Sequence, residues 1–168
     1  MEQYSHILAL EAVTHTKKNT RRDEVAMYRR AAGVGASPKV IEVIEESEEI
    51  GLVTYKYPYS LDEASRSGVK LSAEAKLSLE AKMKSVHLLG ILHRDITEEN
   101  FVCNLDGTEA YIIDFGLSVR VDSVSLSILR AYIEDFEQEE VLTGDRTELA
   151  SIAKRLEIRK LANLLKHF

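Results

Sequence analysis

The chain has 168 residues, of which 45% are hydrophobic, and its formal net charge is −6. This length and hydrophobic share are enough for one domain with a buried core. The negative charge argues against a protein whose whole surface binds nucleic acid or anionic lipid, although a local basic patch is still allowed. The single cysteine, Cys103, excludes an internal disulfide, no apolar run approaches the roughly 18 residues of a membrane span, and the N-terminus lacks the basic start of a signal peptide. We therefore expect an intracellular, cytoplasmic protein (in the host cytoplasm if it is viral) that binds neither DNA nor membranes.

The first third of the chain predicts mainly strands. Residues 5–16 are β-prone and predict a strand, and "NTRRDEVAMYRRAAG" predicts a helix that Asn19 or Thr20 caps and that Gly33 ends. One face of this helix carries Val25, Tyr28 and Ala32. Residues 39–57 then predict two strands joined by the acidic turn "EESEE".

After Pro58 the pattern changes to helices with one hairpin. Residues 72–90 predict a long helix that Gly90 ends, and residues 101–116 predict a hairpin with its turn at Asp106-Gly107. The remainder is helical, with two apolar stripes: Leu126, Leu129, Ile133 and Phe136, and Leu149, Ile152 and Leu156. We predict an α+β fold of one domain over residues 1–168, with a small β-rich lobe over about 1–57 and a helical lobe over about 58–168.

Two short strings concentrate polar side chains between the long helix and the end of the hairpin. "GILHRDITEENFV" holds Asp95 and Asn100 five residues apart, and "YIIDFGLS" holds Asp114. Asp95 is suited to accept a proton from an attacking hydroxyl. Asn100 and Asp114 offer hard oxygen ligands of the kind that bind Mg²⁺ alongside phosphates. Phosphoryl transfer depends mainly on such positioning and charge neutralisation.

"HRDITEEN" and "DFG" resemble the catalytic loop and the metal-binding motif of eukaryotic-type protein kinases. The resemblance implies a minimal two-lobed protein-kinase-like fold that binds ATP and Mg²⁺. It also implies that Asp95 is the catalytic base and that Asn100 and Asp114 are catalytic metal ligands. The surrounding motif residues would be structural: His93, Arg94, Phe115 and Gly116.

The resemblance extends toward the N-terminus. In kinases, a helix glutamate pairs with the lysine that binds the α- and β-phosphates, and Glu24 is the natural candidate because its helix contains no other glutamate. Tyr28 would lie one turn later and join the hydrophobic column that runs through the residues matching His93 and Phe115. "GLVTYKYPYSL" resembles the strand and hinge that contact adenine. This likeness implies nucleotide contacts by three residues: Thr54 near the gatekeeper position, and Tyr55 and Tyr57 on the hinge.

Two features of the front part depart from the kinase pattern. No glycine precedes Gly33, so the glycine-rich loop that covers the ATP phosphates is missing, and backbone phosphate binding is weakened or supplied otherwise. The lysine position is also ambiguous, because Lys17 and Lys18 adjoin and neither has a Val-Ala-x-Lys context. Strand alternation favours Lys18 as the cleft-facing residue. Either lysine can equally be a solvated charge at a strand end.

The third departure is the short C-terminal part, which has no Ala-Pro-Glu motif after "DFGLS". Reduced large lobes occur in the RIO kinases and in the kinase subunit of the KEOPS complex, and the tail resembles the latter most. Those kinases usually carry glycine in place of Arg94. An arginine at this position commonly pairs with a phosphorylated activation-loop residue. The nearby candidates are Ser118, Ser123 and Ser125, for which the alternative is that they are plain surface serines.

The leading prediction is a minimal ATP- and Mg²⁺-dependent protein serine/threonine kinase that acts on a protein substrate. The first alternative is a pseudokinase, a nucleotide-binding scaffold that regulates a protein partner. The missing glycine loop favours this alternative, whereas the presence of Asp95, Asn100 and Asp114 together favours the enzyme. The second alternative is an ATPase subunit of an RNA-modifying, tRNA-related assembly, which only the KEOPS-like tail suggests.

Overall fold

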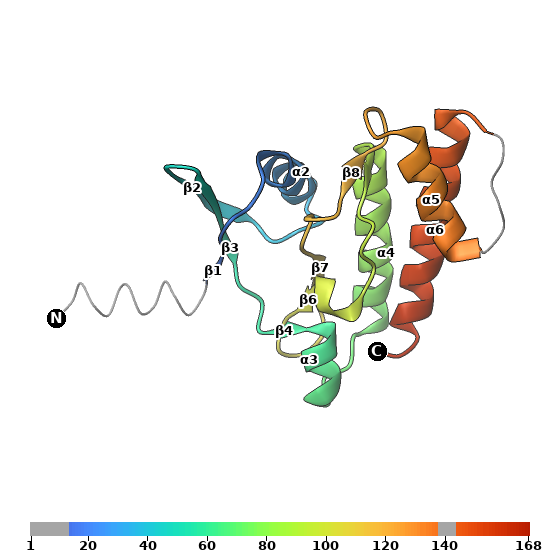
Figure 1. Cartoon of the computed structure of the whole chain (residues 1–168). Coiled ribbons are helices and arrows are strands. Elements are labelled where there is room, and N and C mark those ends of the chain that lie inside the picture. Colours follow the sequence, from blue (N-terminus) through green and yellow to red (C-terminus); the bar gives the residue numbers. More distant parts are fainter. Residues whose placement is uncertain (1–13, 138–143) are drawn as a thin grey trace.

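The computed structural model describes residues 14–137 and 144–168, and its fold is mixed α+β, as expected (Figure 1). Three strands and helix α2 form a small lobe on one side. Helices α4, α5 and α6 pack beside one another on the other side, and the β6–β7 hairpin lies between the two groups. Most of the predicted strand at residues 5–16 lies outside the described residues.

The small lobe is a three-stranded antiparallel sheet in the order β1-β3-β2, with α2 (Arg22–Gly33) beside it. The strands are β1 (Thr14–Lys17), β2 (Val40–Glu46) and β3 (Glu49–Tyr55), and the β2–β3 turn falls within the predicted acidic segment. The predicted cap of α2 was wrong: Arg21 occupies the N-cap position without a side-chain hydrogen bond. Thr20 lies one residue too early, and its hydroxyl donates to the Lys17 carbonyl instead.

The larger lobe begins with α3 (Leu61–Arg66), whose start is fixed by a capping box between Ser60 and Glu63. The long helix α4 (Ala73–Leu88) is capped by the Ser72 hydroxyl, which accepts from Ala75 N–H. A second sheet has the order β4-β6-β7, and β5 pairs with β8. These short strands are β4 (Tyr59–Ser60), β5 (Ile91–Leu92), β6 (Phe101–Cys103), β7 (Ala110–Ile112) and β8 (Val119–Arg120).

The predicted hairpin turn is confirmed and requires glycine. Gly107 has φ = 72°, in the left-handed region. A Cβ at this position would lie 2.1 Å from the Lys70 carbonyl oxygen, so the turn packs directly against the chain before α4. The Gly107 carbonyl in turn accepts a hydrogen bond from Ser72 N–H, at 2.9 Å. One glycine thus joins the hairpin to the start of the long helix.

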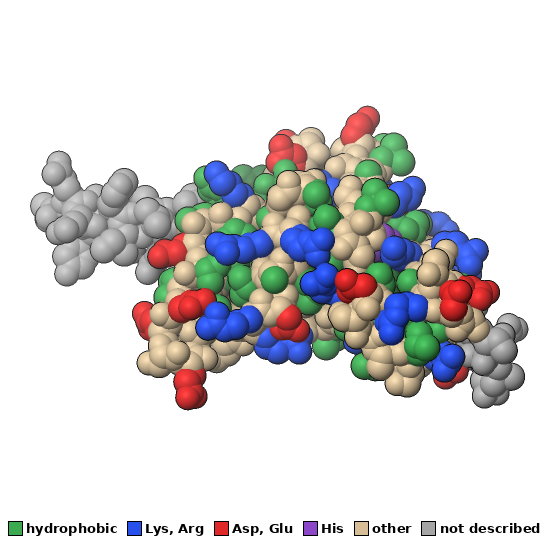
Figure 2. Space-filling model, turned by 90° about the horizontal axis from the view of Figure 1, so that it is seen from above, with side chains coloured by type: hydrophobic (Ala, Val, Ile, Leu, Met, Phe, Trp, Pro, Cys, Tyr) green, Lys and Arg blue, Asp and Glu red, His purple; other side chains and the backbone are tan. Residues whose placement is uncertain are grey.

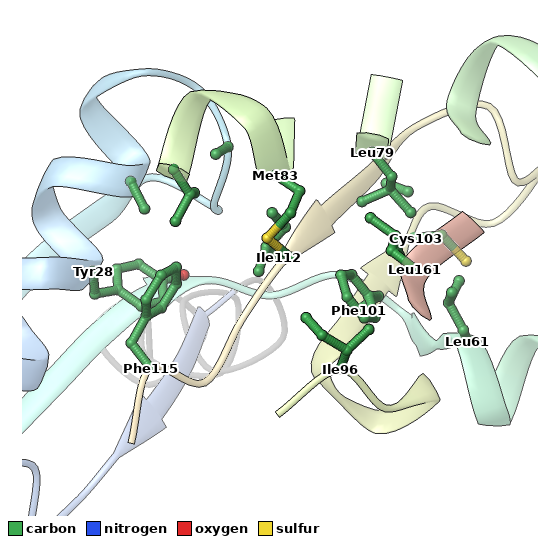
Figure 3. Close-up of a cluster of buried hydrophobic side chains, with 14 of the residues drawn as sticks. Tyr28, Leu61, Leu79, Met83, Ile96, Phe101, Cys103, Ile112, Phe115 and Leu161 are labelled. Atoms are coloured by element: carbon green, nitrogen blue, oxygen red, sulfur yellow. The ribbon is translucent and has the colours of Figure 1, made fainter. Parts of the chain in front are cut away.

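Two hydrophobic clusters hold these elements together. The larger runs from α2 through α4 and the hairpin to the end of α6 (Figure 3). The smaller joins α5 (Leu126–Glu137) to α6 (Arg146–Leu165) and contains both of the predicted apolar stripes. None of the helices in the described ranges is long and apolar enough to cross a membrane. Lys and Arg side chains lie across the middle of the upper face, interspersed with acidic ones (Figure 2).

Candidate functional site

A cleft of about 410 Å³ opens between the small lobe and the hairpin. Its walls come from β1, α2, β3, the segment that follows β3, and the end of the hairpin. A cleft of this volume is within the usual range of small-molecule sites. Most of the candidate residues of the small lobe line it, together with one from the second motif: Lys17, Glu24, Tyr28, Thr54, Tyr55, Tyr57 and Asp114.

Lys17 joins two carboxylates that are far apart in the sequence. Its Nζ lies 2.5 Å from Glu24 Oε1 and 2.8 Å from Asp114 Oδ1. Burial alone would lower the pKa of Lys17, but its hydrogen bonds to Asp114 and Glu24 raise that pKa above the ordinary value. Burial would likewise raise the pKa of Asp114, yet the hydrogen bonds from Lys17 and from Gly116 N–H lower it. Lys17 and Asp114 are therefore both charged at neutral pH.

The structure places Lys17 at the cleft, which corrects the preference for Lys18. In the β1–β3 register, His15 is opposite Thr54 and Lys17 is opposite Leu52, so these side chains share the face that lines the cleft. Lys18 lies on the opposite side with Thr16, near Ile44 and Gly51. Alternation along β1 does not by itself say which face borders the cleft, because the register of β1 on β3 decides it.

The first motif forms a tight loop between β5 and β6. Asn100 is buried, and its Nδ2 donates to the Asp95 carboxylate at 2.7 Å and to the Asp95 carbonyl at 2.9 Å. Both amide hydrogens of Asn100 therefore point to Asp95, and its amide oxygen is left for another partner. Arg94 has φ = 68°, a left-handed conformation that is uncommon for a non-glycine residue. Such a residue is held by its surroundings and is typical of functional loops.

One side-chain and one backbone hydrogen bond join the first motif to the second. The His93 ring nitrogen Nε2 lies 2.8 Å from the Ile113 carbonyl oxygen, and Ile113 N–H donates to the Asn100 carbonyl at 2.9 Å. Because β6 starts directly after Asn100 and Asp114 follows just after β7, the two metal-ligand candidates emerge at the same end of the hairpin.

The turn at Asp114 needs the glycine of the second motif. Asp114 has φ = 58°, and its Oδ1 accepts from Gly116 N–H at 3.0 Å. A Cβ built on Gly116 would lie 3.0 Å from Asp114 Oδ1 and 3.6 Å from Lys17 Nζ. A side chain at this position would press against the ion pair. The Gly116 carbonyl also accepts from the Arg21 guanidinium at 2.8 Å, which ties the motif to the start of α2.

A buried aromatic column connects α2 to both motifs, and Figure 3 shows its Tyr28 and Phe115 members. The rings of Tyr28 and Phe115 meet edge to face with centroids 5.7 Å apart, and Phe115 meets the His93 ring at 5.0 Å. All three side chains are buried. The column fixes the distance of α2 from the motifs, and with it the position of Glu24 beside Lys17.

The residues that were expected to contact adenine lie along one wall of the cleft. Thr54 is buried at the end of β3, whereas the Tyr55 side chain is 48% exposed. Tyr57 packs against Tyr111 of β7 with ring centroids 4.7 Å apart. This aromatic contact places the segment after β3 against the hairpin, and Tyr57 lines the cleft there.

The sequence analysis missed a buried carboxylate under the first motif. Glu157 of α6 has no exposed surface, and it accepts hydrogen bonds from His87, from Tyr132 and from the backbone of the loop. Burial alone would raise the pKa of Glu157, but the hydrogen bonds from the His87 ring and from Arg94 N–H lower it. The available signal was positional: Ala153, Glu157 and Leu161 recur every four residues, so a glutamate occupies the buried face of the helix.

The donor set fits a magnesium–phosphate complex better than a metal site made by protein alone. Within residues 14–137 and 144–168, no group of three or more His, Cys, Asp or Glu side chains could hold a metal. Asn100 and Asp114 offer one amide and one carboxylate oxygen, since Asp114 Oδ1 is already bonded to Lys17. Mg²⁺ is commonly bound through one or two protein oxygens, with substrate phosphates and water as the other ligands.

Comparison with known proteins agrees with this geometry. No protein-family model matches the chain. It is 30% identical over 129 residues, 68% of its length, to a probable serine/threonine-protein kinase, pknA2, of Bifidobacterium longum (strain NCC 2705). It is 27% identical over 84 residues, 46% of its length, to the cell division cycle 7-related protein kinase of Homo sapiens. The chain is a distant, partial relative of protein kinases.

The matched regions span only 17% and 15% of those two relatives. They support a kinase-like superfamily, and the names of both relatives are those of phosphotransferases. They do not support the more specific likeness to RIO kinases or to the KEOPS kinase subunit.

Proposed function

We propose that this protein is a minimal protein serine/threonine kinase that uses ATP and Mg²⁺ to phosphorylate a protein hydroxyl. The observation that carries the proposal is that Lys17 joins Glu24 to Asp114 in the lining of a 410 Å³ cleft. A structural ion pair would not need the additional Asp95–Asn100 pair at the same end of the hairpin. The kinase names of the two relatives point the same way.

In the proposed reaction the cleft residues divide into two groups. Leu52, Thr54 and the segment that follows β3 would contact the base, while Lys17, held by Glu24, would bind the phosphates. Asn100 and Asp114 would hold Mg²⁺, which supplies charge neutralisation on the phosphates.

Asp95 would accept the proton of the substrate hydroxyl as the hydroxyl oxygen bonds to the γ-phosphorus. The bond from that phosphorus to the bridging β–γ oxygen breaks, and ADP leaves. Asn100 holds the Asp95 carboxylate in place through the 2.7 Å hydrogen bond. The other oxygen of Asp95 is then the one that can face the substrate.

The second candidate is a pseudokinase that regulates a protein partner. The observation that favours it is the saturation of Lys17, whose ammonium already contacts both Glu24 and Asp114. Such a lysine could serve only to stabilise the fold. No feature of the described residues specifically favours the other alternative, an ATPase subunit of an RNA-modifying assembly.

Asp95→Asn separates the enzyme from the scaffold. The variant keeps the phosphate and metal residues, so we expect unchanged MgATP binding and a loss of phosphoryl transfer of about 10² to 10⁴-fold. Transfer is measured with radiolabelled ATP, first as autophosphorylation and then with added protein substrates; Asp106→Asn, an exposed aspartate at the hairpin turn, is the control. Equal label in parent and Asp95→Asn would refute the role of Asp95. Binding without transfer under any condition would favour the pseudokinase.

A further inference from the structure

A second hollow, of about 560 Å³, adjoins the candidate nucleotide cleft. Its lining comes from the end of α2, the loop that joins α2 to β2, the end of β3 with the segment after it, and strand β7. Pro38, Tyr55 and Tyr57 line both spaces, so the hollow and the cleft share a wall. Apart from this wall, the hollow contains none of the residues that were assigned to the proposed reaction.

The loop between α2 and β2 builds the hollow into the backbone. The Ala36 carbonyl accepts a hydrogen bond from Ile112 N–H of β7 at 2.9 Å, which fixes the loop against the hairpin. Gly33 and Gly35 both line the hollow, and no atom lies within 4 Å of the position that a Cβ would take at either residue. The two missing side chains therefore leave the space open.

Ser37 brings an unused polar group to the hollow. Its side chain lines the hollow and is only 3% exposed, and its Oγ has no hydrogen-bond partner within residues 14–137 and 144–168. A buried hydroxyl without a partner costs free energy, so the protein, water or a ligand normally satisfies such a group. Because Ser37 borders the hollow, a molecule bound there would supply the partner that its hydroxyl lacks.

The charged side chains in the lining are both cationic. Arg29 and Lys39 are exposed, and neither belongs to an ion pair in the part of the chain that the structure describes. Two cations without a counter-charge beside one hollow contrast with the net charge of −6 of the whole chain. The carbonyl end of α2 would oppose an anion, but the Ala31 and Ala32 carbonyls already accept from N–H groups of the loop. The hollow thus offers two positive charges and one buried donor.

We propose that this hollow is an anion-binding site, separate from the nucleotide cleft, that takes a carboxylate or phosphate group. The Ser37 hydroxyl would donate to one oxygen of the anion, while Arg29 and Lys39 would neutralise its charge. Two sources can supply such a group: a small molecule and an acidic side chain of a protein partner. The site does not depend on the proposed kinase function, because it shares none of the phosphate or metal residues of the cleft.

Nuclear magnetic resonance of the isotope-labelled full chain measures binding at the hollow itself. One titration uses inorganic phosphate, and a second uses a hexaglutamate peptide with hexaglutamine as its control. We expect the backbone amides of Gly33, Gly35 and Ser37 to shift and to saturate with phosphate, with hexaglutamate or with both. Tighter binding of hexaglutamate than of phosphate would identify a protein partner as the source, and binding of phosphate alone would identify a small molecule.

Removing the Ser37 hydroxyl tests the built part of the site. Ser37→Ala should weaken the binding of the anion at least about tenfold, since a buried hydrogen bond to a charged group is lost. Its melting temperature should stay the same or rise, because the hydroxyl makes no hydrogen bond among the described residues. The double variant Arg29→Gln/Lys39→Gln should also weaken binding at least about tenfold. Arg30→Gln, a change to the exposed arginine next to Arg29 that lies outside the lining, is the matched control.

Filling the hollow tests the site without removing any charge or donor. Gly33 has helical backbone and open space at its Cβ position, so Gly33→Leu should fold normally and abolish the shifts at Ser37. Lys17→Met, which alters the nucleotide cleft, should leave these shifts intact. The proposal would be overturned if neither probe shifted these amides, or if Ser37→Ala or Gly33→Leu bound the anion like the parent. It would also be overturned if the shifts vanished in Lys17→Met, because the anion would then lie in the cleft.

Discussion

Replacing Lys17 by methionine tests the central ion pair of the site. The substitution retains most of the side-chain length and removes the charge that Glu24 and Asp114 share. The Glu24 side chain is only 6% exposed, so its carboxylate would be left buried without a cation, whereas Asp114 at 44% would be hydrated by solvent. An unpaired buried group costs about 1–3 kcal/mol. Because the Lys17 side chain is itself 34% exposed, solvent screening favours the lower half of that range.

We therefore expect Lys17→Met to lower the free energy of unfolding by about 1–2 kcal/mol, or the melting temperature by about 2–8 °C for a chain of this size. Lys18→Met is the matched control, since Lys18 is exposed on the other face of β1, and it should change stability by no more than about 0.5 kcal/mol. Thermal unfolding followed by calorimetry measures both. Adding MgATP should then raise the melting temperature of the parent and of Lys18→Met by several degrees. The melting temperature of Lys17→Met should not change.

The double variant Lys17→Met/Glu24→Gln distinguishes stability from binding. Making Glu24 neutral removes the uncompensated buried charge, so the double variant should regain part of the lost stability and still fail to respond to MgATP. The reasoning would be refuted if Lys18→Met were the more damaging change. It would equally be refuted if Lys17→Met bound MgATP as the parent does.

Further outcomes follow from the same geometry. Asp114→Ala should abolish the stabilisation by MgATP, and an equal thermal shift in variant and parent would exclude its metal role. The pKa of Asp114 is below its ordinary value of 3.8 and that of Lys17 is above 10.5, so the stability advantage of the parent over Lys17→Met should be constant between about pH 5 and 9. Urea titrations should show this stability difference shrinking as the pH falls through the lowered pKa of Asp114. A difference that grows in acid would contradict the ion pair between Lys17 and Asp114. Gly107→Ala should lower the free energy of unfolding by at least about 2 kcal/mol, because it combines left-handed strain with a clash at 2.1 Å from the Lys70 carbonyl oxygen. Gly68→Ala is the control and should lose only the strain contribution, since Gly68 has φ = 75° and no atom within 4 Å of its Cβ. Similar losses of stability at the two sites would show that the contact with Lys70 does not matter.

Several elements could be predicted from the sequence because their signals are local. The faces of α2, α5 and α6 follow from apolar residues at three- and four-residue spacing, and Asp106-Gly107 marks a turn wherever the hairpin packs. The two motif strings also predicted that Asp95, Asn100 and Asp114 lie near one another. The first string leads into the first hairpin strand and the second string ends the other, so both lie at the same end of the hairpin.

Tertiary structure decided what depends on pairing between distant segments. Whether Lys17 or Lys18 faces the cleft is set by the register of β1 on β3, and a shift of one residue would exchange the two. The role of Glu157 is set by the packing of α6 under a loop more than sixty residues earlier in the chain. In the sequence a buried glutamate looks like any other helix glutamate. Its environment exists only once α4, α5 and α6 have packed and excluded water from the carboxylate.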